Sequence, residues 1–167
     1  MRQQTQNIDY RTGRTRGFTM VELLITLAVS AILLSIAVPS FTDMVQNNRL
    51  TTQANQFIIA LNYARSEAVK RAATIDVIAT NATSANEWGG GWKVAINGGA
   101  DLKIFPALDG SSVLDSPSGI SSFQYQANGR ATVTENFTLC DDRSGETGRQ
   151  ISISTTGRAE TSDTACS

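Results

Sequence analysis

Histidine is absent from the 167-residue sequence, and cysteine occurs only twice, at Cys140 and Cys166. The lack of histidine excludes the Ser-His-Asp and Cys-His nucleophilic arrangements and most zinc sites. The acids are scattered along the chain, and no nucleophile motif accompanies them. We therefore expect a protein that is not an enzyme and that holds neither a metal nor a cofactor.

Net charge is also small, and the charged residues are unevenly placed. The whole chain has a net charge of −1, which gives no excess of cations for nucleic-acid binding. From Phe18 to Ser167, 10 basic side chains stand against 14 acidic ones. Residues 1–17 carry one acid, Asp9, and four arginines, Arg2, Arg11, Arg14 and Arg16. Loss of this segment would turn a nearly neutral chain into an acidic one.

Residues 18–38 form a long apolar run in which Glu22 is the single charge. As a helix, a run of this length spans about 30 Å, the thickness of the hydrocarbon core of a bilayer. The arginines of residues 1–17 flank only one end, so the positive-inside rule keeps that end in the cytoplasm and sends the rest outward. We predict a single transmembrane helix.

Two simpler interpretations of this run compete. A cleaved secretory signal is suggested by Ser35-Ile36-Ala37, but the run is longer than a usual signal and contains a carboxylate. A plain signal-anchor helix explains the length but not Glu22, because a carboxylate in an apolar span costs roughly 2.5–3.5 kcal/mol. Such a group usually has a partner or a function.

The residues from Gly17 to Glu22, Gly-Phe-Thr-Met-Val-Glu, resemble the cleavage motif of type IV prepilins and pseudopilins. The resemblance implies that a prepilin peptidase cuts between Gly17 and Phe18 and methylates the new Phe18 amine, so that the apolar helix stays on the mature protein. In a filament, Glu22 of one subunit would then neutralise the Phe18 amine of a neighbour, which makes a buried carboxylate tolerable.

A helical period continues beyond the apolar run, from about Phe18 to about Ala72. Pro39 is expected to kink this helix where the chain leaves the bilayer. An apolar stripe follows on one face, and polar residues such as Asn48 and Gln53 lie largely off that face. The stripe consists of Leu50, Ala54, Phe57, Leu61, Ala64 and Ala68.

From Thr74 onward, short alternating runs separated by turn residues replace the helical period, and Asn128-Gly129 is a good hairpin turn. No helical pattern lies between these runs, which favours a mainly antiparallel sheet. The predicted fold class is α+β, a long N-terminal helix, half transmembrane and half amphipathic, packed on a β-rich head. The expected strands are 75–79, 92–96, 102–105, 121–126, 137–140 and 150–154. The expected segments are a leader (1–17), a transmembrane helix (18–39), an amphipathic helix (40–72) and a periplasmic head (73–167).

Three further stretches resemble the GspH/FimT class of minor pilins and pseudopilins, which implies a type IV pilin-like fold. The pair of C-terminal cysteines is most similar to that of FimU-like minor pilins in this class. The stretches are a helix signature at 61–69, a glycine-rich turn at 88–92 and a final hairpin at 149–158.

Four residues within or beside these stretches have plain structural interpretations. Arg65 and Glu67 are expected on a solvated face of the helix. Trp88 and Trp92 are expected to cap the core rather than to stack on a ligand. The glycines between them do not precede a helix, unlike those of a phosphate-binding loop.

Cys140 and Cys166 are expected to form a disulfide, because the head of such a protein is exported to an oxidising compartment. Closing a loop of this length stabilises the head by roughly 3.5 kcal/mol in the chain-entropy model. The bond would also pin a Ser/Thr-rich tail that could not hold itself down. Two free thiols are an alternative, whereas a metal site is disfavoured because two cysteines without histidine supply too few soft ligands.

The resemblance implies a minor pilin that primes the assembly of type IV pili, enters them and supports twitching motility. Its partners would be other minor pilins, the major pilin, the prepilin peptidase and the inner membrane, with the head in the periplasm and then on the cell-surface pilus. One alternative is an H-type pseudopilin of a type II secretion system. Another is a DNA-binding pilin for natural transformation, which would contact DNA through Arg149 and Arg158. Some DNA-binding members of the class carry a C-terminal Gly-Arg-x-Arg motif. DNA is disfavoured here, because Gly148-Arg149 and Gly157-Arg158 both lack the second arginine of that motif.

Overall fold

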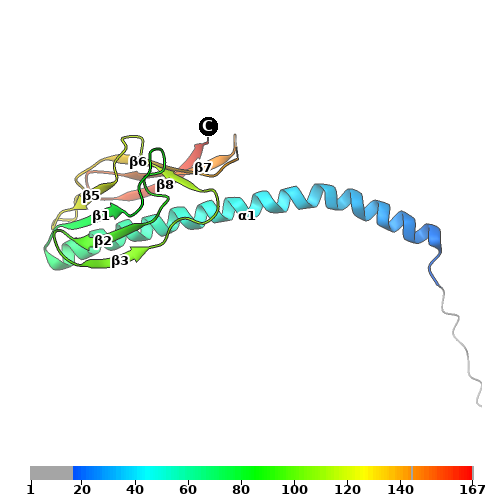
Figure 1. Cartoon of the computed structure of the whole chain (residues 1–167), viewed down its shortest axis with the longest axis horizontal. Helices are drawn as coiled ribbons and strands as arrows, with labels where there is room; N and C mark the ends of the chain where they lie inside the picture. Colours follow the sequence, from blue (N-terminus) through cyan, green and yellow to red (C-terminus); the bar gives the residue numbers. More distant parts are fainter. Residues whose placement is uncertain (1–16, 144, 167) are drawn as a thin grey trace, which may run out of the picture. The chain divides into compact units, whose positions relative to one another are not determined.

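The computed structural model of the chain describes residues 17–143 and 145–166, so residues 1–16 of the expected leader lie outside the described part. In that part, one helix precedes eight strands (Figure 1). The chain divides into two compact units, the first ending at Phe41 and the second beginning at Thr42, and each is described by itself. The elements are α1 (Met20–Arg71), β1 (Ile75–Ala79), β2 (Trp92–Ile96), β3 (Asp101–Phe105), β4 (Val113–Asp115), β5 (Ser122–Tyr125), β6 (Glu135–Cys140), β7 (Thr147–Ile153) and β8 (Ala159–Ala165).

The first unit holds the N-terminal part of α1, from Met20 to Phe41, and every residue of this part is exposed. Within the described residues, α1 is the one helix whose length and composition would allow it to cross a membrane. A helix that is apolar on all sides needs lipid or other helices to cover it. The helix continues through Pro39 without a break, so the kink expected there stays a prediction.

In the second unit, α1 continues to its end and buries the whole predicted apolar stripe. The prediction is wrong for two polar residues beside that stripe. Gln53 is 5% exposed and donates from Nε2 to the carbonyl oxygen of Asp109, 2.9 Å away. Glu67 is 7% exposed, and a hydrogen bond from Arg71 holds the pKa of its carboxyl below the usual range. The helical period locates the buried face, but contacts made by other segments widen it.

The turn predicted at Asn128-Gly129 is present, and it is tied to the helix. Gly129 has a φ of 78°, and the N–H of Gln126 donates to the carbonyl oxygen of Arg130 at 2.9 Å. The carbonyl oxygen of Gly129 accepts a hydrogen bond from Nε of Arg65 at 3.0 Å. Arg65 is therefore half-buried and anchors this turn to α1, instead of lying on a solvated face.

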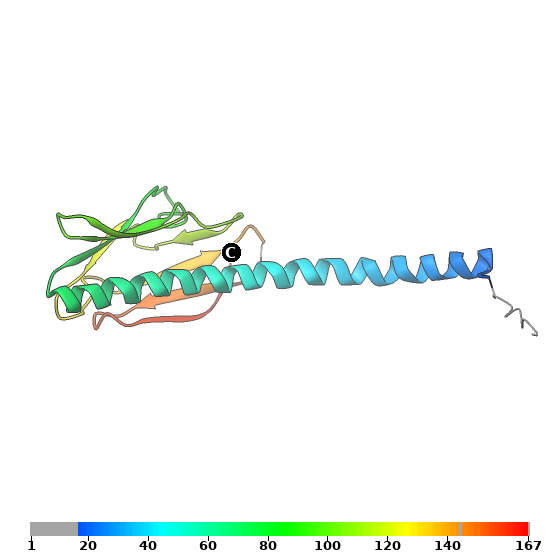
Figure 2. The same cartoon turned by 90° about the horizontal axis from the view of Figure 1, so that it is seen from below.

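The strands form two four-stranded sheets, with the orders β3-β2-β1-β5 and β4-β6-β7-β8 (Figures 1 and 2). All pairings between the named strands are antiparallel, as the sequence predicts. The six predicted strands are all present, with ends that differ by a few residues at most.

Two strands, β4 and β8, are missed by the sequence pattern. β4 has only three residues, too few to show an alternation. β8 reads Ala-Glu-Thr-Ser-Asp-Thr-Ala and has no buried side chain, yet all seven of its residues pair with β7. The polar tail expected to be unable to hold itself down is therefore a strand, and its backbone ladder rather than its side chains secures it.

An aromatic cluster at the centre of the head joins the helix to both sheets. The ring centroid of Phe57 on α1 lies 4.9 Å from that of Trp92 on β2, 5.1 Å from that of Phe137 on β6 and 5.4 Å from that of Trp88. Nε1 of Trp88 donates to the carbonyl oxygen of Ile120 at 2.8 Å, so the buried indole N–H is satisfied. Both tryptophans are fully buried and lie inside the core rather than capping it.

Replacing Phe57 with alanine is expected to lower the free energy of unfolding of the full chain in detergent by about 3–5 kcal/mol, because a large cavity would open between the sheets. Ile59 on the same helix is 56% exposed, so Ile59→Ala is the matched control and should change stability by less than about 0.5 kcal/mol. Denaturant unfolding followed by tryptophan fluorescence measures both. Equal effects of the two substitutions would contradict the central place given to Phe57.

Candidate functional site

The expected cleavage site lies immediately before the first turn of α1. Gly17 and Phe18 precede the helix, and the Phe18 side chain is 78% exposed. The backbone N–H of Glu22 donates to Oγ1 of Thr19 at 3.2 Å, which makes Thr19 the N-cap of a helix that begins at Met20. Cleavage between Gly17 and Phe18 would therefore place a new amine just outside the helix start.

The sequence reasoning missed this cap, although its signal is visible. Thr19 and Glu22 have the Thr-x-x-Glu spacing of a capping box, in which the acid also favours the positive end of the helix dipole. The spacing and the helix dipole therefore predict a local role for the Glu22 side chain in starting the helix, besides the pairing with a neighbour that the apolar setting suggests. The two roles differ chemically, because a cap needs only a hydrogen-bonding side chain, whereas pairing with an amine needs a negative charge.

In the head, a disulfide joins Cys140 at the end of β6 to Cys166, which follows β8, with a Cα–Cα distance of 5.8 Å. β6 and β8 are not neighbours, because β7 lies between them. The register of β6 and β7, extended by one residue, puts Cys140 opposite Gly148. A Cβ atom on Gly148 would lie 2.5 Å from Sγ of Cys166 and 2.8 Å from Sγ of Cys140. The bond therefore passes over β7 where that strand has no side chain.

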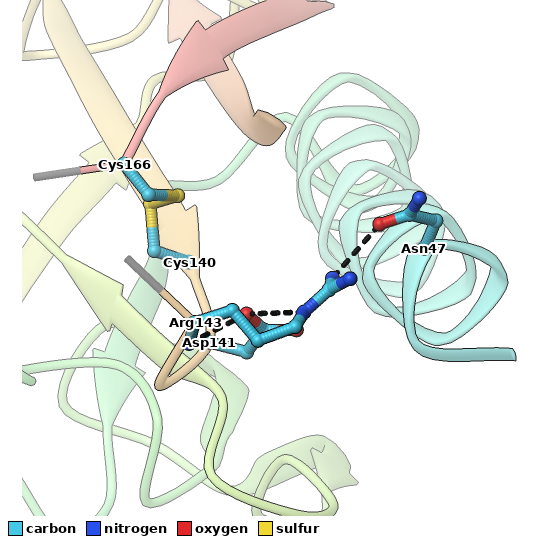
Figure 3. The surroundings of a disulfide bond; sticks show 5 residues. All are labelled: Asn47, Cys140, Asp141, Arg143 and Cys166. Atoms are coloured by element: carbon cyan, nitrogen blue, oxygen red, sulfur yellow. Dashed lines mark hydrogen bonds and ion pairs between the residues drawn. A yellow bond between two sulfur atoms is a disulfide. The ribbon is translucent and has the colours of Figure 1, made fainter. Parts of the chain in front are cut away.

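The segment that follows Cys140 is fastened to α1 by Arg143 (Figure 3). The guanidinium of Arg143 donates to both carboxylate oxygens of Asp141 at 2.9–3.1 Å, and its Nη2 also donates to Oδ1 of Asn47 at 2.8 Å. Asp43 lies 3.6 Å from Nη1. Burial alone would raise the pKa of Asp141, but the hydrogen bonds from Arg143 outweigh it and lower that pKa. No local sequence pattern marks the contact between Arg143 and Asn47, because the two residues are distant along the chain.

A second group of polar side chains lies around Ser116. The Ser116 N–H donates to Oε2 of Glu87 at 3.1 Å, and its hydroxyl donates to Oε2 of Glu135 at 3.2 Å. Burial and a hydrogen bond shared with Glu87 raise the pKa of Asp115. Burial opposes the ionisation of Glu87, but hydrogen bonds led by the Ser116 N–H outweigh it and lower its pKa. The pKa values of these two carboxyls are therefore moved apart, that of Asp115 upward and that of Glu87 downward.

Metal-binding geometry is not found in this group or elsewhere in residues 17–143 and 145–166. No set of three or more His, Cys, Asp or Glu side chains there is arranged to hold a metal ion.

The two arginines considered for DNA binding are not brought together. Arg149 on β7 reaches Oγ1 of Thr51 on α1 at 3.1 Å and pairs with Asp163. Arg158 pairs with Glu160 at 2.8 Å and belongs to the opposite face of the sheet, since its register position alternates with that of Arg149. Each arginine already has a carboxylate partner, so the pair does not form a shared basic surface.

Comparisons with known proteins match two stretches of the chain, one in the N-terminal region and one that covers most of the head. A family profile described as "Type II transport protein GspH" matches residues 53–157, and one described as "Prokaryotic N-terminal methylation motif" matches residues 13–38. Two crystal forms of the type IV minor pilin FimU from Pseudomonas aeruginosa PAO1 are similar in structure, both at 25% sequence identity. The first covers 71% of this chain and 92% of the FimU chain with a TM-score of 0.62. The second covers 67% and 91% with a TM-score of 0.58. No curated protein matches the chain.

Gly148→Ala is expected to destabilise the disulfide-bonded head, because the new methyl group would overlap both sulfur atoms and the Leu139 carbonyl oxygen, 2.5 Å away. We expect a loss of about 1–3 kcal/mol in the free energy of unfolding. The matched control is the same substitution in a Cys140→Ala/Cys166→Ala background, where the sulfur atoms are absent and the loss should be smaller. Denaturant unfolding of the four variants measures the difference. An equal loss in both backgrounds would assign the whole effect to the carbonyl contact.

Proposed function

The chain belongs to the GspH family and has a type IV pilin fold, and we propose that it is a minor pilin that primes the assembly of type IV pili and is incorporated into them. The observation that carries this proposal is the combination of a methylation motif, a long exposed apolar helix and a head similar to that of FimU. None of the three alone separates a pilus subunit from other anchored proteins. Their order along one chain is what a filament subunit requires.

The chemistry of this function is association rather than catalysis. Cleavage of the Gly17–Phe18 bond leaves the apolar helix on the head and creates a positive amine, which is then methylated. Pairing of that amine with Glu22 of an adjacent subunit allows the carboxylate to remain charged in an apolar filament core. Small residues in the apolar helix allow neighbouring helices to approach closely; they include Ala28, Ala31 and Ala37.

Each segment of such a subunit has its own place in the cell. Residues 1–17 form the cytoplasmic leader, residues 18–39 lie in the inner membrane and later in the filament core, and the head from residue 73 lies in the periplasm and later on the pilus. Residues 40–72 connect the two as the amphipathic half of the helix. The partners are other minor pilins, the major pilin and the prepilin peptidase that processes them.

A second candidate function is that of an H-type pseudopilin of a type II secretion system. The description of the matching family, a type II transport protein, favours it. Processing, anchoring and fold would be the same in both systems, so only the partner subunits differ. DNA binding has less support, because Arg149 and Arg158 lie on opposite faces and each is paired with an acid.

A strain lacking this gene is expected to lose surface pili and twitching motility while it keeps type II secretion. Electron microscopy of pili, a twitching assay and a secreted-enzyme assay on the same strain measure the three outcomes. Complementation with the wild-type gene is the control. Loss of secretion with normal pili would overturn the pilus assignment in favour of the pseudopilin.

Glu22→Gln is expected to leave membrane insertion and cleavage intact but to reduce incorporation into filaments about tenfold or more, as Glu22→Ala should. Tenfold corresponds to about 1.4 kcal/mol. Gln retains the hydrogen bonds of a capping box but lacks the charge, so the two variants separate the two roles of Glu22. Mass analysis of the N-terminus checks cleavage at Phe18, and immunoblots of sheared filaments measure incorporation. Normal incorporation of Glu22→Gln, with failure of Glu22→Ala, would leave only the capping role.

A further inference from the structure

Three of the four sheet edges in the described part of the chain are protected against pairing with another strand. β3 is interrupted by a register shift at Val94/Ala95 of its partner and carries the exposed Lys103. β4 is only three residues long, and its Leu114 already bonds through both backbone groups to the loop that contains Trp88. Bulges, lysines, short strands and covering loops are the usual protections of an edge.

The β5 edge is protected by the chain that follows it. The N–H of Thr132 donates to the carbonyl oxygen of Gln124 at 2.9 Å, and the Gln124 N–H donates to Oγ1 of Thr132 at 3.0 Å. Tyr125 forms an isolated antiparallel bridge with Ala131. A returning segment therefore uses the backbone groups that a partner strand would need.

The β8 edge has none of these protections. Its seven residues pair with β7 in one unbroken register, and they include neither proline nor lysine. Its two charges are neutralised within the hairpin, because Glu160 pairs with Arg158 and Asp163 pairs with Arg149. Within residues 17–143 and 145–166, no segment is assigned to the outer side of this strand.

Alternation of the antiparallel ladder identifies the groups that point away from β7. The N–H of Ser154 donates to the carbonyl oxygen of Arg158 at 3.0 Å, and the N–H of Cys166 donates to that of Glu146 at 3.0 Å. On the β8 side these two bonds involve Arg158 and Cys166, which are both even-numbered. The even-numbered residues of β8 between them therefore also bond to β7. The odd positions then direct their N–H and C=O groups outward; they are Ala159, Thr161, Asp163 and Ala165.

This outward row is held rigidly at both of its ends. The hairpin turn closed by Ser154 and Gly157 fixes its start, since the Gly157 N–H donates to the Ser154 carbonyl oxygen at 2.8 Å. The disulfide at Cys166 fixes its end. An edge that is fixed before binding loses little conformational entropy when a partner strand adds to it.

We propose that β8 is a docking edge to which a different subunit of the same pilin class adds a strand of its head through main-chain hydrogen bonds. This inference rests on the proposed function, which brings several such heads together above one membrane. The side chains at Thr161 and Ala165 are small, so the partner strand can carry larger residues opposite them.

A second copy of this chain cannot add its own β8 to the edge as an antiparallel strand while both copies are anchored in one membrane. An antiparallel pair of identical β8 strands is related by a twofold axis that reverses the strand direction. β7 and β8 run roughly along the C-terminal half of α1 (Figure 2), so the same axis would reverse that half as well. The Thr42 ends of the two copies would then face opposite ways, whereas subunits anchored in one membrane must present them to the same side.

The test compares Thr161→Pro with Thr161→Ala in the full chain, expressed in the deletion strain. Proline removes an outward N–H without removing a bond to β7, which edge strands tolerate, and alanine keeps that N–H. Each variant also carries a photo-crosslinking p-benzoylphenylalanine in place of Glu160, and a control carries it in place of Ile104 on β3. Thr161→Lys serves as a second blocking variant if the proline variant unfolds. Thermal unfolding and thiol alkylation confirm that each head is folded and disulfide-bonded.

The expected result is a crosslink from position 160 to a different protein with a Gly-Phe-Thr-x-x-Glu-type leader, reduced about tenfold by Thr161→Pro or Thr161→Lys but not by Thr161→Ala. Crosslinks to a second copy of this chain, crosslinks only from position 104, or equal crosslinking in all variants would overturn the docking edge. If the alanine and blocking variants restore pili equally, the edge proposal fails while the pilus function stands. If deletion of the gene leaves pili and secretion unchanged, the proposed function itself fails.

Discussion

The head depends on the burial of one face of α1 against two sheets that share no strand. Phe57 makes this contact at a single point, because its ring meets Trp92 of one sheet and Phe137 of the other. The helix supplies side chains to a hydrophobic core that both sheets share. Disruption of the helix in this region would therefore expose that shared core as well as remove one element.

The same helix has two different surroundings along its length. Up to Phe41 all of its side chains are exposed and most are apolar, which is stable only in lipid or among other helices. From Leu50 onward one face is buried in the head and the other carries polar groups. Arg143, Asp141 and Asn47 lie close to this change and fasten the disulfide-bonded segment to the helix where its burial begins.

The sequence predicts those elements in which apolar buried and polar exposed side chains follow the period of a helix or a strand. The stripe from Leu50 to Ala68 and the strands with buried alternation are found as expected. β8 could not be found this way, because a backbone ladder holds it while its side chains stay in solvent. Glu67 and Gln53 were misplaced because their burial depends on contacts with an arginine and a loop carbonyl that the helical period does not encode.

The residues of the candidate site also fall into two groups, those that a local sequence pattern marks and those that it does not. Gly17, Phe18 and Glu22 belong to a local motif that is visible in the sequence, and the same motif contains the Thr19 cap. Arg143 reaches Asn47 on α1, which is distant along the chain, and Gly148 lies beneath a disulfide whose path depends on strand register, so no local pattern marks either residue. The proposed pairing of Glu22 with a neighbouring amine would join two subunits.

The path of the disulfide across β7 makes it a check on strand alignment. A slip of β8 by two residues would carry Cys166 about 6.8 Å along the sheet, and a slip of one residue would turn it to the other face. Either error would leave the two sulfur atoms out of bonding reach. The disulfide can therefore form only in a head in which β6, β7 and β8 are already in their native register. Chains with misaligned strands keep two free thiols, which distinguish them from correctly folded chains.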